Sequence, residues 1–333
     1  MKQPTRVALA AVIFFAALAA LPRNARTVEA TSAFPSRPIM AIVPFSAGGP
    51  TDTLIRVLSE HVASSLGQPL IIEDITGATG TIAVGRVIAA APDGYTLSIG
   101  NVATHVYNAA TFHLRYDLLK DLAPVALLPS SSFILVSRND APAKNLDELI
   151  KWIKANPDKV TLGTPGVGSV SHVAALLFQN LTNTQLKFIP YRGAAPAMQD
   201  LLGGHIDLMI DTALNSLPQI SKGTIKAYAV AAERRLNSAP EIPTVDEAGL
   251  PGFYAGVWNG IWAPKDTPPG VILKINRAVN AALDDPTVRR RLAELGMELP
   301  PQGQRTPEAL GNFQRAEAKK WWPIIKAAHI IND

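Results

Sequence analysis

The chain has no cysteine in its 333 residues. This absence excludes disulfides, thiol nucleophiles and metal centres held by cysteine. It also excludes lipid attachment through a cysteine near the amino terminus. Charged residues are scarce, at 17%, and hydrophobic residues make up 47%, a balance that favours well-buried cores over disorder. The length fits two α/β units of about 100–200 residues each better than one core.

Long hydrophobic runs are scarce as well, and the one that is present lies near the amino terminus. It covers residues 7–21, after Lys2 and Arg6, and is shorter than the roughly 20 residues that a membrane span needs. Small residues follow it, so we predict that residues 1–30 are a cleavable secretory signal peptide, cut after Ala30 or Ala33. A retained anchor helix is the alternative. The expected location of the mature protein is the periplasm.

The net charge of +4 belongs largely to this leader. Residues 1–30 hold four basic residues and one acidic residue, a net charge of +3, which leaves +1 for the rest of the chain. The pI of about 9.2 therefore does not indicate a basic binding surface. We expect no nucleic-acid partner.

Beyond the leader, short apolar runs alternate with segments of helical periodicity. Strands are expected first at residues 39–44, 70–73 and 95–99, with helices at 52–66 and 81–90. Later strands are expected at 133–137, 160–163, 186–190, 206–210, 225–230 and 257–263, and later helices at 146–155, 169–181, 194–202, 270–284, 286–296 and 306–328. The alternation predicts parallel strands joined by right-handed crossovers.

The return to strand character near residue 257 indicates that the chain leaves one lobe, builds a second and comes back. The predicted fold class is α/β, with two lobes that each contain a doubly wound, mostly parallel sheet and with a ligand cleft between them. We predict lobe 1 at residues 34–131 plus 255–333, and lobe 2 at 132–254. Crossing segments near 130–134 and 253–257 would form a hinge.

Glycine-rich loops follow several of the predicted strands. In the first, residues 44–52, two glycines permit a sharp turn, and the next helix begins with unpaired N–H groups. Ligands of open α/β sheets bind at such strand ends. The loop is a candidate anion site, or alternatively a tight turn with a helix cap. Its candidate residues are Phe45, Ser46, Ala47, Gly48, Gly49 and Asp52.

Two further loops and one strand end supply other candidates. Residues 163–172 place Ser169 and Ser171 at the start of a predicted helix, where their hydroxyls can donate to a carboxylate; Ser169 as a simple cap is the alternative. The loop after Gly100 offers Asn101 and Thr104. Asp211, at the end of a predicted strand, is a candidate for the cleft wall.

Motifs for catalysis are missing. The chain has no Gly-x-Ser-x-Gly elbow and no phosphate-binding loop, and its six histidines form no metal-binding motif. Ser171 directly precedes His172, a spacing that does not by itself pair a nucleophile with a base. We expect no enzymatic activity, no cofactor and no metal. A secreted hydrolase using Ser169 or Ser171 is the least favoured alternative.

Several motifs recur together in one known family. They are Phe34–Ile39, the loop Ile42–Asp52, Gly77–Gly80, Pro92–Leu97, Pro190–Gly193, Asp200–Gly204, Pro243–Gly249 and Trp258–Pro264. In this order the chain resembles the Bug family of extracytoplasmic solute receptors, the substrate-binding components of tripartite tricarboxylate transporters. The resemblance implies a type II periplasmic-binding-protein fold and a carboxylate held by backbone groups of the first loop and by ordered waters. It implies a facing half of the cleft made by Ser169, Val170, Ser171, His172, Arg192, Gly193 and Ala194.

The sequence departs from that family at two places. Asp74-Ile75-Thr76 stands where the family has Asn-Arg-Pro, which removes a cation, and Asn108-Ala109 replaces Asn-Pro. The few charged candidates, with Phe45 at the mouth, favour an apolar or aromatic carboxylate over a tricarboxylate. The expected partners are a small organic carboxylate and either integral-membrane transporter subunits or a membrane sensor kinase. The protein itself is expected to be monomeric.

Overall fold

The computed structural model describes residues 34–191 and 193–330, so the predicted signal peptide and Arg192 lie outside the described residues. The strands are β1 (Ile39–Val43), β2 (Leu70–Asp74), β3 (Thr96–Asn101), β4 (Leu122–Arg138), β5 (Thr161–Thr164), β6 (Lys187–Pro190), β7 (Leu208–Thr212), β8 (Ile225–Val230) and β9 (Gly256–Pro264). The α-helices are α2 (Pro50–Leu66), α3 (Thr81–Ile88), α4 (Asn108–Thr111), α5 (Leu146–Ala155), α6 (Val170–Thr182), α7 (Ala194–Leu202), α8 (Ala213–Ser221), α9 (Pro269–Asp284), α10 (Pro286–Glu294) and α11 (Pro307–Ala327). Short helical turns are η1 (Ala78–Gly80), η2 (Ala103–Tyr107) and η3 (Gln302–Gln304).

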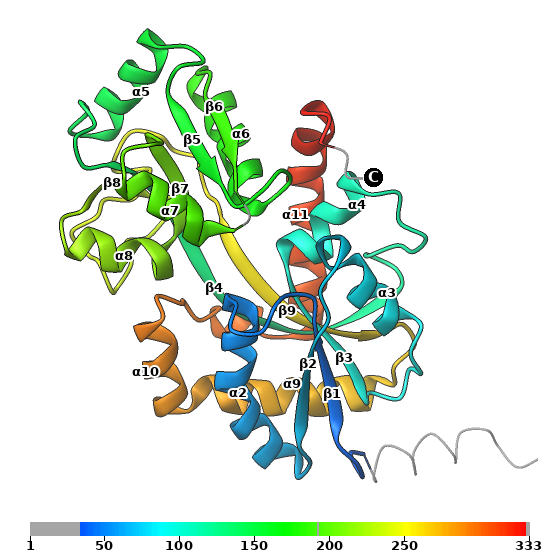
Figure 1. The fold of residues 1–333 in the computed structure, drawn as a ribbon. Coiled ribbons are helices and arrows are strands. Elements are labelled where there is room, and N and C mark those ends of the chain that lie inside the picture. Colours follow the sequence, from blue (N-terminus) through cyan, green and yellow to red (C-terminus); the bar gives the residue numbers. More distant parts are fainter. Residues whose placement is uncertain (1–33, 192, 331–333) are drawn as a thin grey trace, which may run out of the picture.

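The strands follow the order β2-β1-β3-β9-β4-β7-β5-β6, and β8 pairs with β4. β2, β1 and β3 are parallel, as are β7, β5 and β6, whereas β9 and the pairs that β4 makes are antiparallel. β4 is 17 residues long. Its first part pairs with β9 as far as Ser132, and from Phe133 onward it pairs with β7 and β8. One strand therefore belongs to both lobes (Figure 1).

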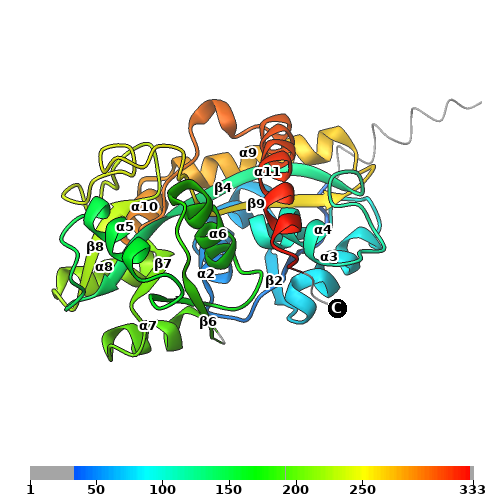
Figure 2. The ribbon, with the colours of Figure 1, turned by 90° about the horizontal axis from the view of Figure 1, so that it is seen from above.

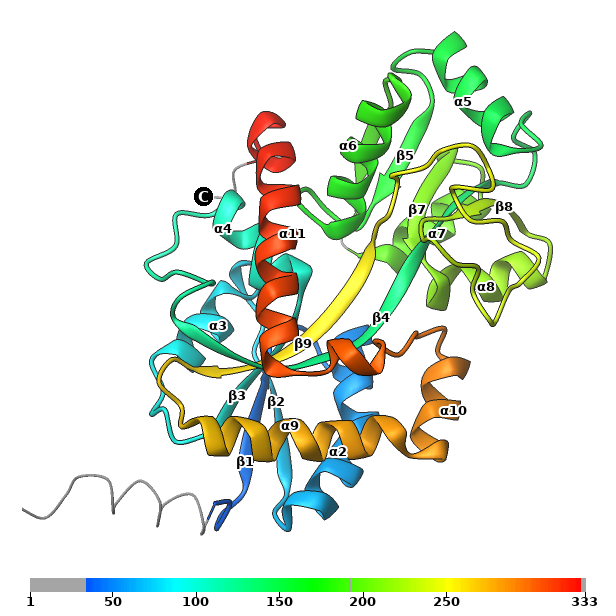
Figure 3. The ribbon, with the colours of Figure 1, turned by 180° about the vertical axis from the view of Figure 1, so that it is seen from behind.

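The lobes are layered, with helices on both faces of each sheet. In lobe 1, α2 packs its apolar stripe, which includes Leu54, Ile55 and Leu58, against β2 and β3 and against α9. α11 packs against β4 and η2, and Figure 3 shows α9 and α11 from behind. Seen from above, β4 and β9 run side by side from one lobe to the other (Figure 2). Among the described helices, none is long and apolar enough to cross a membrane.

Most predicted elements are present, and the differences have physical causes. The strand predicted at 133–137 is the second part of β4; its first part was not predicted. Pro124 and Pro129 lie where the ladder with β9 is irregular, between Pro124 and Ala126 and between Leu128 and Ser131. Proline interrupts both the hydrogen-bond ladder and the alternating pattern. α8 was not predicted either, because Pro218 lies inside it.

A buried polar cluster stabilises the centre of lobe 1. The His105 ring stacks on Trp262, with ring centroids 3.8 Å apart and planes 10° from parallel. Its Nε2 lies 3.0 Å from Ser98 Oγ, and its Nδ1 lies 2.8 Å from Thr104 Oγ1. Burial lowers the pKa of His105 to about 3, so the ring is neutral at physiological pH. Through the contacts of both ring nitrogens, His105 holds the loop after β3 in place.

Candidate functional site

The glycine loops of lobe 1 lie against one another. A Cβ added to Gly80 would be 2.8 Å from Pro44 Cβ and 2.8 Å from Thr104 Cγ2, and Gly80 has a positive φ of 87°. The close approach requires glycine, since any side chain would separate the three segments. Asn108 Nδ2 also donates to Thr79 O, at 3.0 Å. The loops after β1 and β3 and the turn η1 thus pack directly against one another.

The first loop uses its glycine N–H groups internally. Gly48 N–H donates to Asp52 Oδ2 at 2.7 Å, and Gly49 N–H donates to Ser46 O at 3.2 Å. Among the described residues, no acceptor is paired with the N–H groups of Ser46, Ala47, Thr51 and Asp52. The last two belong to the first turn of α2, where the helix carries partial positive charge. The candidate donors to an anion are therefore these four N–H groups and not those of the two glycines.

Asp52 fixes this loop through an ionic network with the half-exposed Arg56. Its side chain is 1% exposed, and Arg56 Nε donates to Oδ2 at 2.9 Å and lies 2.7 Å from Oδ1. Arg56 Nη2 also donates to Asp74 Oδ2, at 3.1 Å. Burial opposes ionisation of Asp52, but the hydrogen bonds from Arg56 and Gly48 outweigh it and lower the pKa of its carboxyl. Burial and the nearby Asp52 raise the pKa of Asp74.

A polar chain at the start of α2 connects the first loop to the crossing strands. Thr51 Oγ1 donates to Asn259 Oδ1 at 3.0 Å, and Asn259 Nδ2 donates to Pro129 O at 2.9 Å. Sequence reasoning gave neither Thr51 nor Asn259 a place in the site. The signal was present in the Trp258–Pro264 motif, which places a polar side chain in an otherwise largely apolar strand.

On lobe 2, the loops after β5 and β6 are tied together. Tyr191 N–H donates to Thr164 O at 2.9 Å, and Gly193 N–H donates to Pro165 O at 3.2 Å. This places Gly193 and the start of α7, at Ala194, beside the loop between β5 and α6. Figure 1 shows the β5–α6 loop on the side of lobe 2 that faces lobe 1, with the β1–α2 loop on the facing side of lobe 1.

The polar residues that open α6 have distinct roles. Ser169 caps the helix, accepting from His172 N–H at 3.2 Å, while the buried Ser171 donates to Ile210 O at 2.6 Å. His172 Nδ1 accepts from Gly168 N–H at 3.0 Å. Burial lowers the pKa of His172, so the ring is neutral and its proton is on Nε2. His172 therefore presents a donor, and its ring packs edge-on against Phe188.

The residues predicted in the third loop are engaged within the protein. Asn101 Oδ1 accepts from Ala103 N–H at 3.0 Å, and Thr104 Oγ1 donates to Asn101 O at 3.1 Å. Thr104 is fully buried, and Asn101 is 8% exposed. These contacts shape the loop, and direct ligand contact by either residue stays a prediction.

Substituting Ser171 tests whether its hydroxyl is structural. Ser171→Ala leaves Ile210 O buried without its donor, and we expect the free energy of unfolding to fall by about 1.5 kcal/mol. Ligand affinity should stay unchanged. Urea titration and calorimetry measure the two quantities, with Ser221→Ala on the exposed end of α8 as a matched control. A tenfold loss of affinity at unchanged stability would instead show that the hydroxyl contacts the ligand.

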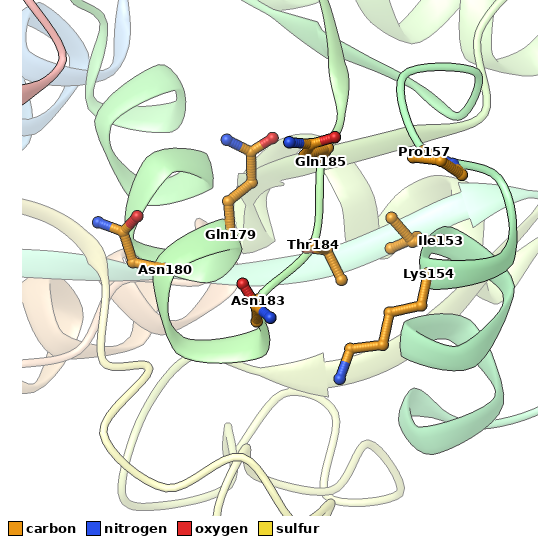
Figure 4. Close-up of a pocket in the computed structure, with 8 residues that line it drawn as sticks. All are labelled: Ile153, Lys154, Pro157, Gln179, Asn180, Asn183, Thr184 and Gln185. Carbon is orange, nitrogen blue, oxygen red and sulfur yellow. The ribbon is translucent and has the colours of Figure 1, made fainter.

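The surface has two hollows, of which one is remote from the loops between the lobes and the other adjoins the first loop. One, of about 460 Å³, lies at the ends of α5 and α6 far from Ser169 and is lined by polar residues such as Gln179 and Asn183 (Figure 4). The other, of about 470 Å³, adjoins the first loop at Ala47 and Gly48 and extends to Thr287 and Arg291 of α10. Among the described residues, no group of three or more acidic or histidine side chains could hold a metal.

Solved structures with the same arrangement place the chain in a class. Periplasmic binding protein BugD matches with a TM-score of 0.76 and 36% identity, over 90% of this chain and all of BugD. MatC from Rhodopseudomonas palustris with bound malate matches with 0.77 and 41%, over 88% and 100%. A second R. palustris protein, solved with adipate, matches with 0.78 and 30%, over 89% and 98%. The fold is that of the two-lobed α/β periplasmic binding proteins, which confirms the predicted fold class.

The family follows from the sequence itself. The model of the tripartite tricarboxylate transporter family receptor, TctC, matches residues 54–330. The chain belongs to this family, as the resemblance to the Bug receptors predicted. It is therefore a solute-binding receptor and not an enzyme.

Proposed function

We propose that the protein captures a small organic carboxylate between its lobes and delivers it to the membrane subunits of a tripartite tricarboxylate transporter. The observation that supports this proposal is the set of four N–H groups at the first loop and the first turn of α2, which have no acceptor among the described residues. Backbone N–H groups at a helix amino terminus favour anions without needing a free cation. The malate and adipate bound by relatives support the same ligand class.

The arrangement of the loops supports binding by lobe closure. Donors come from both lobes: the N–H groups near Ala47 in lobe 1, and His172 Nε2 in lobe 2. A ligand that contacts both sets favours the closed form by its differential affinity for that form. We further propose that the protein works in the periplasm as a monomer, after removal of its leader.

A ligand screen on the mature protein tests the function. Mono-, di- and tricarboxylates are compared with neutral sugars by thermal shift and then by calorimetry. At a concentration 100 times Kd, a ligand stabilises the folded state by about 2.7 kcal/mol, so at least one carboxylate should raise Tm clearly. If no carboxylate raises Tm more than the neutral sugars do, the proposal is wrong.

A further inference from the structure

Asp211 occupies the edge of lobe 2 where the ligand loops lie. β5, β6 and β7 are parallel, so their carboxyl ends share one edge, and Asp211 is next to the last residue of β7. On one side, Ser171 of α6 donates to the preceding residue, Ile210. On the other side, Asp211 pairs with Ile134 of β4, two residues beyond the point where β4 leaves β9. Asp211 thus lies between the start of α6 and the crossing strand.

One carboxylate oxygen of Asp211 has no donor in the part of the chain that the structure describes. Oδ1 accepts from Thr212 N–H at 2.8 Å and lies 3.4 Å from Asn215 Nδ2. Oδ2 is buried and has no hydrogen-bond partner among the described residues, and the side chain is 3% exposed. The hydroxyls of Thr212 and Ser216 are likewise buried without a partner in the described ranges. Buried polar groups are nearly always paired in folded proteins, so this group requires an explanation.

The other aspartate of the same region shows what a structural carboxylate looks like. Asp207, just before the start of β7, accepts from Arg138 Nε at 2.9 Å and from the N–H and hydroxyl of Thr161, each at 2.8 Å. Asp52 in lobe 1 is likewise paired with Arg56. Among the described residues, no cation is paired with Asp211. Burial raises its pKa to about 6, and only Thr212 N–H and Asn215 oppose this shift.

We propose that Asp211 selects ligands that carry a hydroxyl or ammonium group on the carbon next to a carboxylate. Oδ2 of Asp211 would accept a hydrogen bond from that group. The inference rests on the proposed function and narrows its ligand class to hydroxy- and amino-carboxylates. The ligand carboxylate meets the N–H groups of lobe 1, and its donor group supplies the partner that Asp211 lacks. A second carboxylate at that position would meet a like charge and bind less well. A site built to pair with a donor rejects analogues that lack it.

Matched ligand trios test the selection. Each trio keeps one skeleton and changes hydrogen to hydroxyl or ammonium: succinate, malate and aspartate; propionate, lactate and alanine; 3-phenylpropionate, 3-phenyllactate and phenylalanine. Calorimetry on the mature protein should show at least one trio in which a donor-bearing member binds tenfold or more tightly than the plain acid. Asp211→Leu should bring the members of that trio within threefold of one another. Asp211→Asn should retain part of the hydroxyl preference and lose the ammonium preference.

The outcomes separate the two proposals. If plain acids bind as tightly as their substituted relatives, or if Asp211→Leu leaves the preference intact, the role of Asp211 is overturned while carboxylate capture stands. If no member of any trio binds, carboxylate capture fails and the selection fails with it.

Measurements of Tm distinguish ligand selection by Asp211 from a purely structural role of this residue. Burial raises the pKa of Asp211 to about 6 in the folded protein, above its unfolded value of 3.8. The ionised side chain therefore lowers the free energy of unfolding: this cost is absent below about pH 3.8 and fully present above about pH 6. Asp211→Asn should therefore raise Tm by about 2–4 °C at pH 7.5 and have little effect near pH 3.8. Asp207→Asn, the matched control, should lower Tm and leave trio preferences unchanged. A lower Tm for Asp211→Asn at pH 7.5 with unchanged preferences would show that Asp211 is structural.

Discussion

Gly100→Ala is expected to lower the free energy of unfolding by about 3 kcal/mol, because a side chain at this position has no space. A Cβ there would overlap the His105 ring and lie 2.7 Å from Thr104 Oγ1. The ring cannot move aside, since it is stacked on Trp262 and both of its nitrogens are engaged. Overpacking is relieved only by shifting buried side chains or the backbone, which carries the cost.

Urea unfolding of Gly100→Ala measures this effect, and Gly303→Ala is its matched control. Gly303 has no atom within 4 Å of an added Cβ, so its substitution should change stability by less than about 0.5 kcal/mol. Equal effects of the two substitutions would contradict the packing argument. The loop after β3 also contacts the first loop through Gly80, so Gly100→Ala should weaken ligand binding as well.

Asp52→Ala is expected to weaken ligand binding by about 10- to 100-fold. The carboxylate receives a charge-assisted hydrogen bond from Arg56 and one from Gly48 N–H, and such bonds contribute about 1.5–3 kcal/mol. Without these bonds, part of the binding free energy is used to order the loop. Each 1.4 kcal/mol used in this way weakens the affinity about tenfold. Removal of the negative charge favours an anion slightly, but Arg56 already compensates that charge in the native protein.

Calorimetry with the tightest carboxylate from the screen measures the loss. Asp147→Ala is the control, because Asp147 is also in the first turn of a helix but is 68% exposed and pairs only with Lys151. Its removal should leave affinity unchanged. Native affinity in Asp52→Ala would show that the loop keeps its shape without the network.

The sequence predicted where the site lies better than how its donors are used. A glycine pair between a strand and a helix suffices to locate the first loop. Which N–H groups remain for a ligand depends on where the Asp52 side chain turns, and that depends on Arg56 and Asp74, which meet only after β2 pairs with β1. Thr51 and Asn259 are 208 residues apart, and no local pattern connects them.

Lobe 2 shows the same limit. Asp211 was a candidate from its position at a strand end, but only the folded structure shows that its Oδ2 is buried without a partner among the described residues. The division into lobes at residues 131/132 and 254/255 stays a prediction. β4 passes from β9 to β7 and β8 between Ser132 and Phe133, which supports it.

The shared strand β4 has a thermodynamic consequence. It is the outer strand of the sheet in lobe 1 and an inner strand, between β8 and β7, in lobe 2. Melting of lobe 2 would strip β4 from its partners there and also loosen its ladder to β9, so neither lobe keeps its full complement of hydrogen bonds alone. One hydrophobic cluster also contains residues of both lobes, such as Val84 and Leu162. We therefore expect the two lobes to unfold as a single cooperative unit, even though the proposed function requires them to move against each other.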